Sequence, residues 1–435
     1  MQTVRQDRSV PVVGEYDVVV CGGGPAGFVA AISAARSGQK TALIERFSFL
    51  GGTATASYVV PVSGFFFKGN RVVGGIAWEF IRRMEELGAA QVEYPKGHVS
   101  VNPEIYKIVA DEMVRESGVA LYTDTVVTDV LRDGKTVTHV ITESKSGAEA
   151  IGGRCFIDAT GDGDLFARGG CEMLPADAGL QPVSLCFVLS NVDVTTDLLR
   201  DYIHHDGGRA KSSCPKHIRD YLLAEVEAGR APKFGGPWFN VLLAGDALAV
   251  NITRAEADAT NRTEMTETAS RLRKDMHALV DCLKRGFPEF RNAAVTASAF
   301  SVGVRETRRI RGLYTLTFGD VLAGRRFDCP VAHCAHPMDI HSAKDSAQSL
   351  TSLNTDVYVP FESTVSPELD NVIGAGRCVS AEREPYASLR VQATVMSIGE
   401  GAGVAAALRN RLGVSVTELP TDVLKAEFDA RGFVL

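Results

Sequence analysis

The sequence contains no Cys-x-x-Cys motif, and its nine cysteines are scattered along 435 residues. Disulfide frameworks and thiolate metal sites need grouped cysteines, so we expect reduced thiols and no bound metal ion. No run of about eighteen apolar residues occurs, which argues against a membrane-spanning helix. The first ten residues lack the apolar core of a signal peptide, and these absences together predict a cytoplasmic protein.

Positive charge is not in excess either. Lys and Arg number 46 against 53 Asp and Glu, which gives a formal net charge of −7 at pH 7. This balance gives no argument for nucleic acid or an anionic membrane as a partner. The length exceeds that of one ordinary core and predicts two domains, or one large domain with an insertion.

The most informative segment that is present runs from residue 16 to residue 46, YDVVVCGGGPAGFVAAISAARSGQKTALIER. Its pattern is a buried strand, a GxGxxG loop, an alanine-rich helix and a second buried strand. Gly22 allows a tight turn, Gly24 lets the backbone approach a pyrophosphate, and Gly27 lets the helix pack close to the strand. The helix N-terminus then presents free N–H groups to the phosphates, so we expect a bound dinucleotide.

An acidic residue follows this loop at the end of the second strand. Glu45 can accept hydrogen bonds from ribose hydroxyls, which favours a dinucleotide without a 2′-phosphate but leaves NAD and FAD open. No second nucleotide loop follows, and GAG at residues 374–376 lacks a third glycine at the right spacing. A built-in NAD(P)H domain is therefore not expected.

Four stretches together indicate FAD. They are DVVVCGGGPAGFVAAISAARSGQKTALIE, LGGTAT, FIDATGDGDLFARGG and NVIGAGRCVSAEREPYASLRVQATVMSIGEGAGVAAAL. In this order they resemble the FAD-dependent oxidoreductases with a glutathione-reductase-type flavin domain, and more distantly the fumarate reductase flavoproteins. The resemblance implies an α/β fold, in which a glutathione-reductase-type, Rossmann-like FAD-binding domain carries an inserted α+β substrate cap domain. Because GGTATASYVV contains no histidine, attachment of the flavin through histidine is not expected there. We expect non-covalent FAD, and attachment through a cysteine or tyrosine elsewhere stays open.

This fold divides the chain into four parts. Residues 14–171 would form the first part of the FAD-binding domain, with a small insertion at about 59–100. Residues 172–350 would form the cap, 351–412 the second part of the FAD-binding domain, and 413–435 a C-terminal tail. Local patterns predict a hairpin around residues 132–135, strand-rich segments at 181–194 and 238–257, an amphipathic helix over 263–290, and one continuous helix over 387–413.

The expected cofactor contacts come from the glycine loops, the ends of strands and the start of the last helix. That helix can direct its free N–H groups at the flavin edge where negative charge collects on reduction. The FAD-binding residues expected from these patterns are Gly22, Gly24, Pro25, Ala26, Gly27, Glu45, Arg46, Gly51, Gly52, Thr53, Ala54, Ala159, Thr160, Gly161, Asp162, Gly376 and Arg377. The resemblance to the flavin family implies four more, Val126 and Val127 beside the adenine and Val391 and Gln392 at the flavin ring.

Candidate catalytic residues lie in three segments of the second half. GVRETRRIRGLY carries four arginines, which form either a solvated basic face or part of a site. Arg305 follows an apolar run, where a buried guanidinium would require an anion: the FAD pyrophosphate, a carboxylate substrate or Glu306. CPVAHCAHPMDIH ends in His341, a candidate general base or a structural histidine that closes the cap. Its Cys and His spacing matches no standard zinc pattern. Arg383, Tyr386 and Arg390 precede the last helix and are expected to face the substrate.

These features predict an FAD-dependent dehydrogenase or oxidase that removes a hydride from a small organic substrate. An external acceptor, either oxygen, a quinone or a partner protein, would reoxidise the flavin. Reduction of an activated double bond, flavin monooxygenation, and a non-redox FAD-containing lyase or isomerase stay open as alternatives. A homo-oligomer is possible, and the sequence does not identify the substrate.

Overall fold

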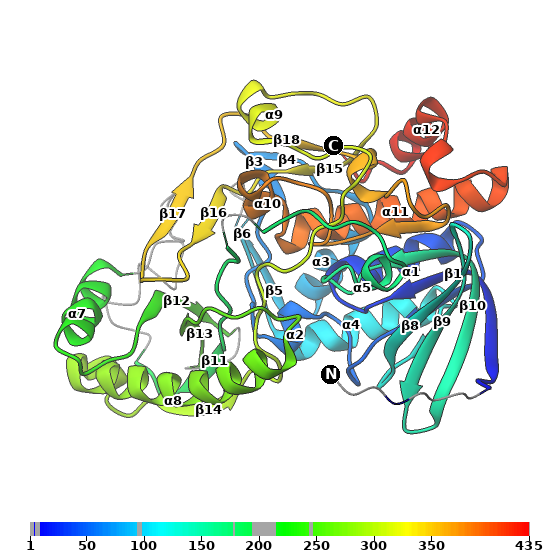
Figure 1. Cartoon of the computed structure of the whole chain (residues 1–435). Helices are drawn as coiled ribbons and strands as arrows, with labels where there is room; N and C mark the ends of the chain where they lie inside the picture. The colour runs from blue at the N-terminus through cyan, green and yellow to red at the C-terminus, as the bar shows by residue number, and fades with distance from the viewer. Residues whose placement is uncertain are drawn as a thin grey trace.

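A computed structural model describes residue 4 and residues 9–93, 98–176, 179–193, 215–242 and 247–434. Its central element is a seven-stranded sheet in the order β7-β2-β1-β10-β9-β8, with β19 also paired to β10 (Figure 1). The strands are β1 (Val12–Cys21), β2 (Thr41–Ile44), β7 (Ala120–Tyr122), β8 (Val126–Asp133), β9 (Thr136–Ser144), β10 (Gly147–Asp158) and β19 (Val372–Gly374).

The sheet is parallel where the glycine loop leaves it. β1 runs parallel to β2 and β10, and β10 runs parallel to β19. Val18, Val19 and Val20 are fully buried, as the apolar β-branched run predicts for a strand covered on both faces. The carboxyl ends of β1, β10 and β19 therefore lie at one edge, where ligands bind in open α/β sheets.

The other half of β10 belongs to an antiparallel meander. β8 and β9 form the hairpin predicted around residues 132–135, and residues 147–152 of β10 pair with β9. The α/β class predicted from the sequence is confirmed by this sheet and the helices that cover it.

Two helices pack on each other over this sheet, α1 (Pro25–Arg36) and α11 (Gln392–Leu412). A Cβ built on Gly399 would lie 2.1 Å from the Ala26 carbonyl oxygen, and one on Gly403 would lie 2.6 Å from the Ala30 carbonyl oxygen. Only glycine permits such backbone contact, so the small-residue face predicted for the last helix is there because α11 lies directly on α1.

The prediction of one continuous helix over 387–413 is wrong. The chain forms α10 (Arg383–Leu389) and α11, which are bent by 89°. Arg390 ends the first helix, and Val391 is extended, with φ −75° and ψ 154°. The break gives α11 its own N-terminus at Gln392, and four backbone N–H groups at such an end lack a partner within the helix.

A second sheet is antiparallel, in the order β12-β13-β11-β14. With the helices α7 (Lys216–Glu227) and α8 (Arg262–Gly286) it lies on one side of the molecule (Figure 1). The long amphipathic helix predicted there is confirmed: it starts after the cap residue Asn261 and buries Leu272, Met276, Leu279 and Leu283. These elements are β11 (Phe187–Ser190), α7 (Lys216–Glu227), β12 (Phe234–Val241), β13 (Leu248–Thr253), α8 (Arg262–Gly286) and β14 (Ala294–Ser298).

Shorter elements complete the fold. Four two-stranded pairs are formed by β3 (Phe66–Phe67) with β4 (Asn70–Arg71), β5 (Ala90–Glu93) with β6 (His98–Val101), β15 (Pro330–Cys334) with β18 (Val357–Pro360), and β16 (Met338–His341) with β17 (Gln348–Thr351). The remaining helices are α2 (Thr53–Ala56), α3 (Gly75–Glu86), α4 (Pro103–Glu116), α5 (Asp164–Arg168), α9 (Phe318–Ala323) and α12 (Thr421–Arg431), with 3₁₀ turns at Pro288–Phe290, Phe361–Thr364 and Val416–Glu418.

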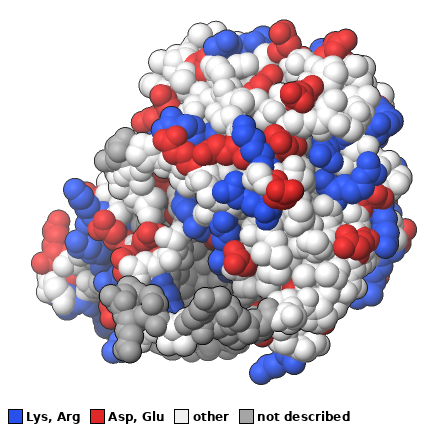
Figure 2. Space-filling view, turned by 45° about the vertical axis from the view of Figure 1, so that its right-hand side comes forward, with Lys and Arg blue, Asp and Glu red and all other residues white. Residues whose placement is uncertain are grey.

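Three global features bear on the sequence-based expectations. Among the described residues, no single helix is long and apolar enough to cross a membrane; α10 and α11 pass that test only as a sharply bent pair, and most of α11 is buried in the core. Eight cysteines are buried free thiols, and Cys214 lies outside the described residues. Acidic and basic side chains are interspersed over the face shown in Figure 2.

One carboxyl group is buried where α11 meets α3. Glu400 is 4% exposed, and its Oε2 accepts a hydrogen bond of 2.8 Å from the Ile76 N–H. A Cβ on Gly75 would come within 2.3 Å of the same oxygen, so the carboxyl group fits tightly. Burial raises the pKa of Glu400 to about 7.

We predict that Glu400→Gln stabilises the protein above neutral pH. The raised pKa of Glu400 in the folded state means that the wild type loses stability as the pH rises from the unfolded value to about 7. Gln keeps an acceptor for Ile76 but cannot ionise. Urea unfolding should therefore show a gain of about 2–3 kcal/mol at about pH 8 that disappears near about pH 4.5.

Glu112→Gln on the exposed face of α4 is the matched control. It should shift the unfolding midpoint equally at both pH values. An equal effect of Glu400→Gln at both pH values would contradict the assignment of a buried, ionisable Glu400.

Candidate functional site

The glycine loop makes a tight turn at the end of β1. The Gly22 N–H donates to the Ile44 carbonyl (2.7 Å), and Gly22 has a φ of +102°. A Cβ there would lie 2.4 Å from the Ala159 carbonyl oxygen, and one on Gly27 would lie 1.7 Å from the Gly22 carbonyl oxygen. Glycine at these two positions is therefore required by the protein's own backbone.

Gly24 differs, because space is open beyond its Cα. A Cβ on Gly24 would meet only the Gly52 Cα, at 3.9 Å. Gly24 is the N-cap of α1 and has no side chain to cap the helix, and Pro25 and Ala26 form its first turn. The second glycine turn closes on this loop, since the Gly51 N–H donates to the Gly23 carbonyl (2.9 Å). The first turn of α1 thus faces a cradle free of side chains, which fits a pyrophosphate.

Glu45, the acidic residue after β2, accepts hydrogen bonds from two backbone N–H groups. Glu45 is 5% exposed; its Oε2 accepts from the Gly23 N–H (2.6 Å) and its Oε1 from the Phe47 N–H (2.9 Å). Burial raises the pKa of Glu45. Each oxygen retains a lone pair for a ribose hydroxyl.

Other residues that we expect at the cofactor lie near Glu45, at the start of β8, at Arg46 and at the start of α2. The Thr125 N–H donates to the Glu45 carbonyl oxygen (3.0 Å), which brings the start of β8 beside it. There Val126 is 47% exposed and Val127 is partly buried. Arg46 is exposed and its guanidinium lies over the Phe47 ring. Thr53 and Ala54 begin α2, directly after the second glycine turn.

The segment after β10 is fixed by two carboxylates. Asp158 accepts from Thr160 Oγ1 (2.7 Å) and from the Leu165 N–H (2.8 Å), and burial raises its pKa to about 6. Asp162 pairs with Arg377 (2.7 Å) and accepts from Thr307 Oγ1 (2.6 Å). Burial opposes the charged form of Asp162, but Arg377 and Thr307 outweigh it and its pKa is lowered.

Asp162 and Arg377, both expected at the cofactor, are thus paired with each other. The pair ties the loop after β10 to the loop after β19. Gly161 lies against the Arg377 guanidinium, and Gly376, with a φ of +105°, comes close to Ala26 of α1. The loops that follow β1, β10 and β19 therefore meet at one edge of the sheet.

The start of α11 carries an unpaired acceptor. Gln392 is 4% exposed, and its Nε2 donates to the Val59 carbonyl (2.8 Å) and the Pro61 carbonyl (3.1 Å). Its Oε1 is buried and has no partner among the described residues. Val391, the N-cap residue, provides no side-chain cap for the helix N–H groups. An acceptor beside free donors fits the edge of a flavin ring, which has both donors and acceptors.

A second group of polar side chains surrounds the end of β16, which lies between α10 and the four-stranded sheet (Figure 1). His341 is 4% exposed. Its Nε2 is 2.9 Å from Asp339 Oδ2, and its Nδ1 is 2.8 Å from an Arg254 nitrogen. Because Arg254 can only donate, Nδ1 is the acceptor and Nε2 carries the proton.

Electrostatics keep His341 neutral. Burial and then the charge of Arg305 lower the pKa of His341 to about 3, against the opposing effect of Asp339. Burial also disfavours the Asp339 carboxylate, but the hydrogen bond from His341 and the charge of Arg390 hold its pKa well below the usual range.

Arg390 and Arg305 join this group from other elements. An Arg390 nitrogen donates to the Asp339 carbonyl oxygen (3.1 Å) and lies 3.5 Å from Gln181 Oε1. Arg305 donates to the Pro182 carbonyl and to Ser184 Oγ, both at 2.8 Å. Burial, followed by the charges of Arg254 and Arg390, lowers the pKa of Arg305 to about 9.

The other two expected catalytic residues lie in α10. Tyr386 is fully buried, donates to the Arg305 carbonyl oxygen (2.7 Å), and its pKa is raised by burial to about 12. It therefore holds the backbone of Arg305. Arg383 begins α10 and is partly buried.

Sequence reasoning missed three members of this group: Asp339, Arg254 and Gln181. Asp339 had a signal, because residues two apart on a strand share a face and Asp339 precedes His341 by two. Arg254 and Gln181 had none, since each reaches the group from a segment distant in sequence.

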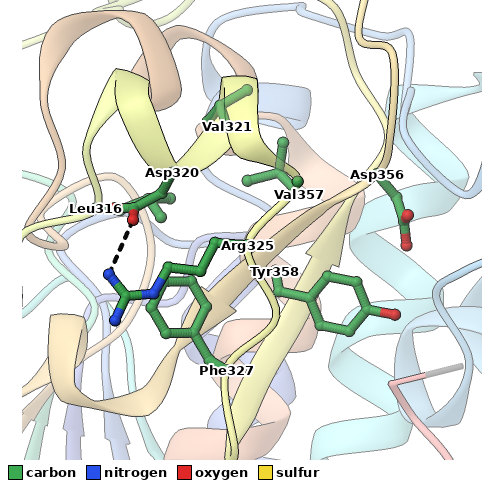
Figure 3. A pocket seen from close by; sticks show the side chains of 9 residues that line it. Leu316, Asp320, Val321, Arg325, Phe327, Asp356, Val357 and Tyr358 are labelled. Carbon is green, nitrogen blue, oxygen red and sulfur yellow. Dashed lines mark hydrogen bonds and ion pairs between the residues drawn. The ribbon is translucent and has the colours of Figure 1, made fainter.

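A small pocket is formed by other residues, beside α9 and β18 (Figure 3). Arg325 reaches Asp320 Oδ1 (3.1 Å) across it and lies over the Phe327 ring. None of the expected site residues lines this pocket. Its lining is Leu316, Asp320, Val321, Gly324, Arg325, Phe327, Asp356, Val357 and Tyr358.

The family follows from comparison with known proteins. The model of the FAD dependent oxidoreductase family matches residues 17–428, and the chain belongs to that family. It is therefore a flavoenzyme whose cofactor is FAD, as the sequence predicted. The comparisons do not show the more distant resemblance to fumarate reductase flavoproteins.

Curated relatives match a short segment. A dihydrolipoyl dehydrogenase of Trypanosoma brucei brucei is 52% identical over 54 residues, which are 12% of this chain and 11% of that protein. A leghemoglobin reductase of Glycine max is 55% identical over 47 residues, 11% of this chain and 9% of that protein. The matched region thus spans about a tenth of the length of these relatives.

Solved structures share the fold over nearly the whole chain. A geranylgeranyl bacteriochlorophyll reductase-like protein of Thermoplasma acidophilum is 13% identical with a TM-score of 0.50, covering 96% of this chain and 83% of that one. The flavin-dependent brominase Bmp2 is 14% identical with a TM-score of 0.51, covering 96% and 82%. At this identity the likeness establishes a Rossmann-like flavoprotein fold only.

Substitution of Gly24 separates FAD binding from folding. Gly24→Ala meets no protein atom closer than 3.9 Å, so the apoprotein should keep its melting temperature. The added methyl group would occupy the cradle, and FAD affinity, measured by fluorescence titration of apoprotein, should fall by about 10-fold or more. Gly27→Ala is the contrast, since its clash with the Gly22 carbonyl should prevent folding. Full FAD affinity in Gly24→Ala would contradict the placement of the pyrophosphate.

Proposed function

We propose that this FAD-dependent oxidoreductase oxidises a small organic substrate bound between the start of α11 and the His341 group. The supporting observation is that His341, Asp339, Arg254 and Arg390 converge beside α10, next to the helix end that we propose contacts the flavin. FAD, when bound, supplies the hydride acceptor.

His341 is the proposed base for the proton that leaves with the hydride. Its neutral imidazole has the required acceptor at Nδ1, which Arg254 occupies in the described arrangement. We propose that the substrate draws the Arg254 guanidinium to itself and so frees Nδ1. Asp339 accepts from Nε2–H, fixes the tautomer and stabilises the imidazolium as it forms.

Two other catalytic candidates, Arg390 and Tyr386, also help to hold this group together. Arg390 binds the Asp339 backbone and Gln181, and Tyr386 holds Arg305 through its carbonyl. Reoxidation would use oxygen, a quinone or a partner protein. The same site could run in reverse on an activated double bond.

An anaerobic titration of the purified FAD protein with small acids, alcohols and amines tests the reaction. The proposal predicts that the flavin bands bleach with one compound class, and admission of air then separates an oxidase from an acceptor-dependent dehydrogenase. Bands that bleach with dithionite but with no compound would contradict oxidation and favour the reductase or non-redox alternatives.

His341→Gln tests the proton transfer. The rate of flavin reduction by the active compound should fall by about 100-fold or more, the range of general base catalysis. Photochemical reduction of the same flavin should be unaffected. His277→Gln on the exposed face of α8 is the control and should keep the wild-type rate. An unchanged rate in His341→Gln would remove His341 from the reaction.

A further inference from the structure

Within the described part of the chain, the buried side-chain atoms of the His341 group that lack a partner are all hydrogen-bond donors. Gln181 Nε2, Arg254 Nε and Arg390 Nε are buried and have no acceptor among the described residues. Gln181 is 0% exposed and Arg254 is 6% exposed. A buried donor left without an acceptor is costly, so three in one group call for an acceptor from outside the chain.

The charges around His341 also favour an anion, because positive side chains outnumber negative ones. Besides burial, Arg254 and Arg390 lie close enough to Arg305 to lower its pKa, and Arg305 and Arg390 lower the pKa of His341. The Asp339 carboxylate opposes these effects at both residues. Around Arg254, Arg219 adds one positive charge and Asp345 one negative charge. Glu306, whose Oε2 accepts from the Gln181 N–H (3.1 Å), is paired with Arg309 (3.3 Å). With His341 neutral, five arginines therefore face three carboxylates, and positive charge is in excess.

The position of Arg254 requires a glycine in the neighbouring strand, and hydrogen bonds hold its side chain there. A Cβ on Gly235 of β12 would lie 2.1 Å from an Arg254 nitrogen. Arg254 donates to the Ala347 carbonyl (3.0 Å) and to His341 Nδ1, and Arg219 donates to the Gly236 and Ser346 carbonyls, both at 2.6 Å. These bonds hold the side chains in position without neutralising their charge.

We infer that Arg254, Arg390 and Gln181, supported by Arg305, bind an oxyanion group of the substrate, a carboxylate or a phosphate ester. This rests on the proposed function and names the substrate class of the same site. Guanidinium forks match both oxyanions, and the amide of Gln181 adds a neutral donor. Bound charge would offset the arginines that depress the pKa of His341, which favours a proton on its imidazole.

The test is equilibrium binding of unreactive anions to the FAD-loaded protein. Acetate, succinate and inorganic phosphate are titrated at constant ionic strength, with flavin absorbance and melting temperature as readouts. Binding by succinate or acetate alone identifies a carboxylate, and binding by phosphate alone identifies a phosphate ester. Absence of saturable binding by all three would overturn the inference.

Variants separate the site from folding. Gln181→Glu places a carboxylate among the arginines, so it should raise the melting temperature and weaken anion binding by about 10-fold or more. Arg254→Gln should weaken binding similarly, and Arg254→Lys should retain part of it. Arg273→Gln on the exposed face of α8 is the control and should bind as the wild type does. Wild-type affinity in Gln181→Glu would overturn the inference.

Failure here and failure of the proposed function give different results. Anion binding without bleaching by any compound would support the oxyanion site and contradict the oxidation. Bleaching by neutral alcohols or amines, with no anion binding, would support the oxidation and contradict the oxyanion site.

Discussion

The close backbone contact of helix α1 with its neighbours is the constraint on which the rest of the structure depends. Gly27 brings the helix against the turn at Gly22, and Gly399 and Gly403 bring α11 against Ala26 and Ala30. Because these contacts leave no room for a Cβ, the distance between β1, α1 and α11 is fixed. The N-terminus of α1 and the N-terminus of α11 are thereby held in one rigid frame, one suited to phosphates and the other to a flavin ring.

The polar group at β16 is built on a different principle. Its arginines and Gln181 surround one buried histidine and one carboxylate, and their unpaired buried atoms are all donors. Such an arrangement is unfavourable without a ligand, because desolvated guanidinium groups repel each other. A bound oxyanion would relieve that cost, so ligand binding and the protonation of His341 are expected to be coupled.

The parts of this structure that follow local patterns could be predicted from the sequence. The glycine loop, the hairpin around residues 132–135 and the helix α8 have their own turn residues and apolar periodicity. The break between α10 and α11 could not be predicted, because Arg390 and Val391 include neither Gly nor Pro. It is stabilised by distant contacts, of Tyr386 with the Arg305 carbonyl and of Gln392 with Val59.

The sequence likewise predicted only part of the candidate site. His341, Arg305 and Arg390 stood out by residue type, whereas Arg254 and Gln181 meet them only through the packing of β13, β16 and the segment before β11. The most direct test of the whole account is a crystal structure of the FAD-loaded protein with succinate. The account predicts the pyrophosphate at Gly24, the flavin ring at Gln392, and the carboxylate on Arg254 and Arg390. FAD phosphates bound to those two arginines, with the Gly24 cradle empty, would contradict it.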